Sequence, residues 1–177
     1  MDRDTWISIG LVASIVAAFG LYWLVGEYAA DPFADNNFVS RFPEKSLDYS
    51  VKTLQELAAK PDLREFYVFP LLFPLDLFVM LALAASMGAA IWFWLGRSMS
   101  AWVRIALLVP LVYLLSDLIE DCFLAWLLQR QDAIPAMTWV LKALTAIKLV
   151  SVIAAAALTV AAFLLWLRRA RQQASNS

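Results

Sequence analysis

Long apolar runs alternate with short polar stretches along the chain. The first run, Trp6 to Val25, is broken only by small or weakly polar residues, and its roughly 20 residues cover about 30 Å, the thickness of a bilayer core. Three further runs are at least as long. The pattern predicts an all-α polytopic membrane protein, with four transmembrane helices in an antiparallel bundle forming a single membrane domain over residues 1–177. The expected helices cover about residues 6–27, 67–96, 102–129 and 137–168.

The first run is long for a signal peptide and is followed by Glu27 and Tyr28 rather than by a small-residue cleavage site. We therefore expect a retained helix, with a cleaved signal as the alternative. Prolines mark the second and third runs. Pro70 and Pro74 predict a kink, or a helix that begins near Pro74, and Pro110 predicts a kink in the third helix.

The long first loop, residues 31–65, is the main polar segment of the chain. Within it, Ser46 can cap a helix in which Leu47, Val51, Leu54 and Leu57 recur at helical spacing. This predicts an amphipathic helix that ends at proline 61 and lies on the membrane surface or over the bundle. The polar tail, residues 172–177, is predicted to be disordered.

Composition supports a membrane protein and narrows its chemistry. Hydrophobic residues make up 63% of the chain and charged residues only 16%, too few to cover a soluble surface of this size. A net charge of −1 gives no case for nucleic acid as a partner. With Cys122 as the single cysteine and no histidine, an intrachain disulfide and a His-based triad are excluded, and haem or zinc-finger sites are not expected.

Arginine placement predicts the orientation. Basic residues precede the first helix, flank the second connection and follow the fourth helix, namely Arg3, Arg97, Arg104, Arg168, Arg169 and Arg171. Because positive charge is retained on the cytoplasmic side, both termini are expected in the cytoplasm and the long loop outside. The expected location is the inner (cell) membrane of a bacterium, crossed several times.

Ionisable residues occur inside the predicted membrane segments, where each costs roughly 2.5–3.5 kcal/mol. The predicted orientation places six of them at one depth in the outer half, namely Asp76, Asp117, Glu120, Asp121, Lys142 and Lys148. Glu27 lies at the edge of this layer, and Tyr113 and Thr145 share helix faces with its members. Adjacent helices would place Lys148 against Asp117 or Glu120. We expect these residues to form a pocket that is open to the outer face.

Four acids and two lysines leave an excess of two negative charges in this layer. The excess favours a bound cation, a cationic ligand or carboxyls that stay protonated, whereas structural salt bridges would balance more naturally. Carboxylates without His or Cys partners favour Mg²⁺, Ca²⁺ or Mn²⁺, with Asp76, Asp117 and Glu120 as candidate ligands. A purely structural role stays open.

Three functions fit this pattern. The first is a small protein that binds or transports a cation, a lipid head group or a small ligand. The second is a metal-dependent membrane enzyme that acts on a lipid or isoprenoid substrate. The third is an assembly subunit of a membrane complex, with another membrane protein or a second copy as its partner. The lipid bilayer surrounds the chain in all three.

Two short motifs carry a family resemblance. They are Phe73-Pro74-Leu75-Asp76-Leu77-Phe78 and, some forty positions later, Asp117-Leu118-Ile119-Glu120-Asp121. With the long first loop, they resemble a family of uncharacterised bacterial four-helix membrane proteins that carry an Asp in the second helix and a D-x-x-E-N signature in the third. In this chain Asp121 replaces the Asn and adds a charge. The resemblance implies the four-helix topology and points to Asp76, Asp117 and Glu120.

Overall fold

The computed structural model describes residues 3–28, 33, 50–95 and 101–175, and all regular structure within them is helical. Within these ranges, four spans are long and apolar enough to cross a membrane: Asp4–Tyr28, Pro61–Trp94, Ala101–Gln129 and Gln131–Gln172. This confirms the prediction of an all-α chain with four membrane-length segments. In chain order the elements are α1 (Arg3–Tyr28), α3 (Val51–Ala58), α4 (Pro61–Phe66), η2 (Tyr67–Asp76), α5 (Leu77–Trp94), α6 (Ala101–Gln129), η3 (Gln131–Ala133) and α7 (Ile134–Ser175).

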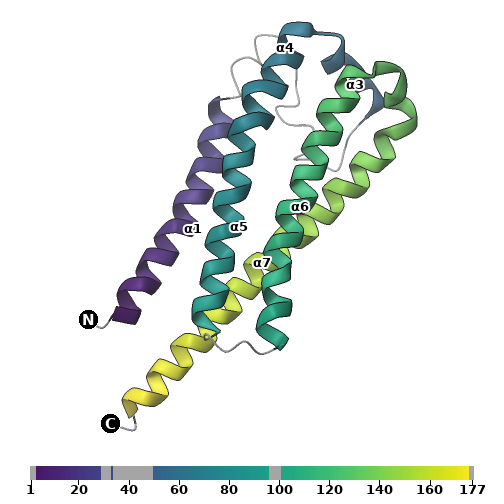
Figure 1. The fold of residues 1–177 in the computed structure, drawn as a ribbon. Helices are drawn as coiled ribbons and strands as arrows, with labels where there is room; N and C mark the ends of the chain where they lie inside the picture. The colour runs from purple at the N-terminus through teal and green to yellow at the C-terminus, as the bar shows by residue number, and fades with distance from the viewer. Residues whose placement is uncertain (1–2, 29–32, 34–49, 96–100, 176–177) are drawn as a thin grey trace.

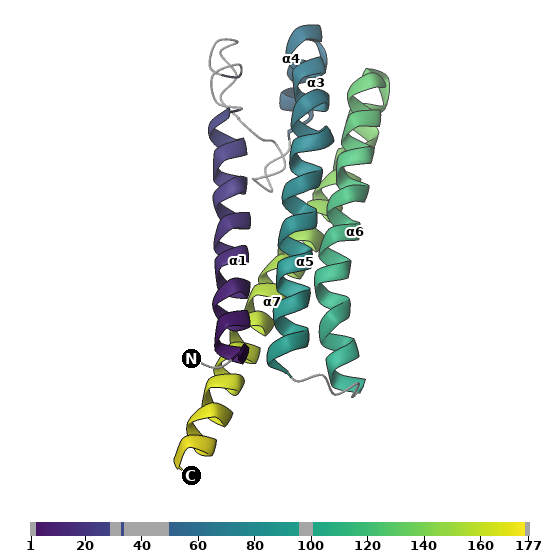
Figure 2. The same ribbon diagram turned by 60° about the vertical axis from the view of Figure 1, so that its left-hand side comes forward.

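The four long segments run up and down alongside one another (Figure 1). Both chain termini lie at one end of the molecule, called here the terminal end. Helices α3 and α4 lie at the opposite end, called here the cap end (Figure 2). Helix α5 packs against α1, α6 and α7, and the most extensive helix pair is α6 with α7, which slants across the others. Helix α5 is therefore the central element of the described structure.

Helix α7 is longer than the sequence predicts at both ends. It begins at Ile134 instead of residue 137, because Pro135 fits the first turn of a helix, where its missing N–H is not needed. It also continues through Ser175, whereas the sequence predicts disorder from Gln172; residues 176–177 lie outside the described part. Its 42 residues rise about 63 Å, roughly twice a bilayer core. Its last turns therefore extend past the other helices (Figure 2).

The second segment is interrupted at its two prolines, as predicted. Phe69 and Phe73 have extended backbone angles, φ −139°, ψ 119° and φ −127°, ψ 116°, within the wide turns of η2. Each precedes a proline, and the proline ring disfavours helical angles in the residue before it. Regular α-helix begins only at Leu77. Helix α6, in contrast, passes through Pro110 as one helix.

Helix α3 packs over the cap end of the bundle. Ser50 caps it, with its Oγ accepting a hydrogen bond of 2.9 Å from the Thr53 backbone N–H. Ser46, the predicted cap, lies outside the described residues. Leu54 and Leu57 are fully buried, and α3 contacts both α6 and α7. The apolar stripe of α3 thus faces the bundle.

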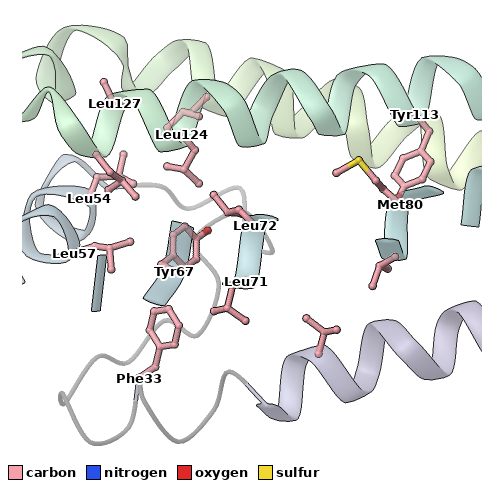
Figure 3. Packing of buried hydrophobic residues seen from close by; sticks show 14 of the residues in the cluster. Phe33, Leu54, Leu57, Tyr67, Leu71, Leu72, Met80, Tyr113, Leu124 and Leu127 are labelled. Carbon is pink, nitrogen blue, oxygen red and sulfur yellow. The ribbon is translucent and has the colours of Figure 1, made fainter. Parts of the chain in front are cut away.

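Most of the hydrophobic core lies in the cap half, where α3, η2 and α6 meet (Figure 3). Leu71 and Leu72 of η2 and Leu124 of α6 are fully buried there. Phe33 packs edge-on against Tyr67, with ring centroids 5.8 Å apart. This core fixes η2, and with it Asp76, the last residue of η2, against α6.

A second, smaller cluster joins α1, α5 and α7 at the terminal end. Trp94 is buried there, and its indole Nε1 donates a hydrogen bond of 3.1 Å to Ser8 Oγ of α1. Helix α1 is otherwise largely exposed, including Trp6, Val16 and Trp23. The terminal half of α1 is therefore anchored to α5 by a specific polar contact as well as by packing.

Candidate functional site

One turn of α6 carries three buried acids. Asp117, Glu120 and Asp121 stand at i, i+3 and i+4, which places them on one face of a helix. Their exposed fractions are 3%, 0% and 0%, whereas Ile119 on another face of the same turn is 54% exposed. The acidic face of α6 therefore points into the protein.

Lys148 of α7 lies against this acidic turn. Its Nζ is 2.7 Å from Asp117 Oδ1 and 2.7 Å from Glu120 Oε2, and all three side chains are buried or nearly so. The Thr145 hydroxyl, one turn earlier on α7, donates a hydrogen bond to the Glu120 carboxylate. Two contacts from α7 thus hold Glu120, and the lysine bridges both acids.

Asp76, the last residue of η2, reaches the same place from just before α5. Asp76, Asp117 and Asp121 each offer a carboxylate oxygen, and these three oxygens lie within 4.8 Å of one another. The sequence predicted Glu120 as the third ligand in this set, but Asp121 takes that place because Glu120 faces Lys148 and Thr145. Ca²⁺ binds oxygens at about 2.3–2.6 Å, so oxygens on opposite sides of it lie about 4.6–5.2 Å apart. The observed spacing is therefore compatible with such a cation.

Two charges predicted for this layer do not join it. Lys142 stands six residues before Lys148, about 120° away around the helix, and its side chain is exposed. Glu27 is likewise exposed, near the cap end of α1. A lysine stem can lie along apolar surface while the ammonium reaches water, so Lys142 needs no buried partner. Among the described residues, four buried or half-buried carboxyls thus share this layer with one lysine, and the formal negative excess is three rather than two.

A cavity of about 200 Å³ adjoins the acids. All four long segments line it, with Phe19, Tyr22, Val25, Asp76, Leu83, Tyr113, Asp117, Lys148, Leu149 and Val152. The Tyr113 hydroxyl hydrogen-bonds to Asp117, so this predicted supporting residue does lie at the site. The α1 side chains in this wall could not be predicted, because no local pattern distinguishes them from the other apolar residues of a membrane-length run.

Fold and site together define an all-helical chain with four membrane-length segments around a cavity that has an acidic side. Comparison with protein-family models, with curated protein sequences and with solved structures gives no match. The resemblance to four-helix bacterial membrane proteins stays a prediction.

Proposed function

We propose that this chain is an integral membrane protein that binds a cation between Asp76, Asp117 and Asp121. The observation that carries the proposal is the ratio of four carboxyls to one lysine in the buried layer, counted over the residues that the structure describes. Each charge at membrane depth costs roughly 2.5–3.5 kcal/mol on insertion scales. A cation held by three carboxylate oxygens offsets that cost and relieves their mutual repulsion.

A structural salt bridge alone requires fewer acids. Lys148 already faces Asp117 and Glu120, which is enough to hold α6 and α7 in register. Asp76 and Asp121 bring two further negative charges to within 4.8 Å of Asp117. Helix association in membranes needs polar contacts but no surplus of one sign. The surplus therefore favours a ligand of opposite charge.

We further propose that the cap end faces outward and both termini face the cytoplasm of the inner membrane. Arg168, Arg169 and Arg171 follow the apolar part of α7 and are exposed, and Arg104 is exposed near the start of α6. All four belong to the terminal end, and positive charge favours the cytoplasmic side. The acidic layer then lies toward the outer face.

The proposal can be tested by thermal unfolding of the purified protein in detergent, with CaCl2, MnCl2, KCl and small ammonium salts at equal ionic strength. At 100 times its Kd, a bound cation adds about 2.7 kcal/mol of stability. Asp121→Asn should remove this stabilisation, and it should also raise the melting temperature of the cation-free protein, because it relieves repulsion. Asp132→Asn, at an exposed acid of η3, is the matched control and should change neither quantity.

The direction in which Asp121→Asn changes the melting temperature distinguishes ligand binding from a structural role. If Asp121 only holds helices together, Asp121→Asn lowers the melting temperature in every salt by the same amount. That result, or the absence of stabilisation by any cation in the unmodified protein, would refute the proposal.

A further inference from the structure

The cavity beside the acids has two chemically different sides. One side carries Asp76 and Asp117, with Lys148 next to them. Apart from two tyrosines, the rest of the lining is apolar and includes Phe19 and Val25 of α1. A hydrated metal ion bound here would place its coordinated water molecules against this apolar wall, where they find no hydrogen-bond partners. A ligand that fits both sides carries a positive charge at one end and hydrocarbon at the other.

The size of the cavity sets the size of the hydrocarbon. An apolar protein cavity of about 150 Å³ is sufficient to bind benzene. The volume here is about 200 Å³. It therefore accommodates one small ring or a short chain, together with a charged group at the acidic side. It is too small for most drug-sized ligands, which occupy pockets of about 300–1,000 Å³.

An ammonium group fits the acidic side in both charge and geometry. Three N–H groups in tetrahedral arrangement, with N···O distances of about 2.8 Å, place their acceptors about 4.6 Å apart. The oxygens of Asp76, Asp117 and Asp121 lie within 4.8 Å of one another. The rings of Tyr22 and Tyr113 also line the cavity, and aromatic faces attract ammonium groups. The excess negative charge argues against a phosphate or carboxylate ligand.

A route to the cavity lies between α1 and η2. A second, more open hollow of about 350 Å³ is lined by Leu24, Val25, Tyr28, Pro70 and Leu75. Val25 borders both spaces. An apolar ligand can thus enter sideways, from the bilayer.

We infer that the ligand is a small organic ammonium ion with an apolar body, held with its charge at Asp76, Asp117 and Asp121 and its hydrocarbon in the cavity behind α1. This inference rests on the proposed cation binding and adds the chemical class of the cation. It also makes α1 a wall of the binding site rather than only a membrane anchor.

Four probes test the inference on the unmodified full chain in detergent: benzylammonium chloride, benzyl alcohol, ammonium chloride and calcium chloride. Benzylammonium should raise the melting temperature in a saturable way. Benzyl alcohol, which has nearly the same shape and enters micelles but carries no charge, should not, and ammonium chloride should act at least tenfold more weakly. If calcium stabilises the protein and benzylammonium does not, the inference is overturned and the proposed cation binding stays intact. Stabilisation by none of the cations would overturn both.

Filling the cavity gives an independent test. Val152→Phe places a ring in the cavity and should raise the Kd for benzylammonium at least tenfold. Val150→Phe, two residues earlier on the same helix and 69% exposed, is the matched control and should leave the Kd unchanged. Equal affinities in the two variants would contradict binding in this cavity. If Val152→Phe does not fold, the probe series on the unmodified chain still decides the inference.

Discussion

Replacing Lys148 by methionine removes the lysine that, within the described part of the chain, pairs with the acidic turn, and it keeps an apolar stem of similar length. In the protein, Lys148 Nζ lies 2.7 Å from carboxylate oxygens of both Asp117 and Glu120. At an effective dielectric constant of about 20, each contact represents about 6 kcal/mol of Coulomb attraction. The variant also avoids the desolvation free energy of burying the ammonium, and this gain offsets much of the lost Coulomb attraction. Removing one partner from a buried ion pair costs about 3–5 kcal/mol, and we expect a loss of this size.

The assay is reversible unfolding in mixed detergent micelles, followed by tryptophan fluorescence. Lys142→Met is the matched control, because Lys142 lies on the same helix with an exposed side chain, and its loss should cost less than about 0.5 kcal/mol. Adding Glu120→Gln to the Lys148→Met variant should recover at least half of the lost stability, since it removes an uncompensated buried charge. If Lys148→Met is as mild as Lys142→Met, or if Glu120→Gln destabilises it further, the ion pairs do not stabilise this layer and the reasoning is wrong.

Two further predictions concern the site and its orientation. Thr145→Val removes the hydrogen bond to Glu120 and should lower the free energy of unfolding by about 1–2 kcal/mol, whereas Thr159→Val, whose hydroxyl donates to a carbonyl of its own helix, should cost less; equal losses would contradict a role for Thr145 at the site. In a Cys-free background, a membrane-impermeant maleimide added to intact cells should label Gln131→Cys at the cap end but not Arg171→Cys at the terminal end. The reverse labelling pattern would refute the proposed orientation.

The periodicity and length of the apolar runs predicted the features that lie within single helices. The four membrane-length segments follow from about 1.5 Å of rise per residue. The break before α5 follows from the restriction that Pro70 and Pro74 place on the residues before them. The grouping of Asp117, Glu120 and Asp121 on one face follows from helical spacing. Each of these features depends only on local backbone geometry, which is the same however the helices pack against one another.

The sequence predicted one contact between helices, that of Lys148 with Asp117 or Glu120, and the structure confirms it. The other contacts could not be predicted, because they depend on how far each helix rotates and slides against its neighbours. Lys142 and Lys148 look alike in an apolar run, and only the packing of α7 on α6 turns Lys148 inward. The same packing commits Glu120 to α7 and leaves Asp121 near Asp76. The cavity wall on α1 is likewise a product of packing, since its apolar side chains carry no distinguishing local pattern. The sequence by itself therefore determined the helices and the acidic turn on one of them. The tertiary structure decided which charges meet and where a ligand can fit. The reason is that the rotation of a helix about its axis is set by the side chains of its neighbours and not by its own residues.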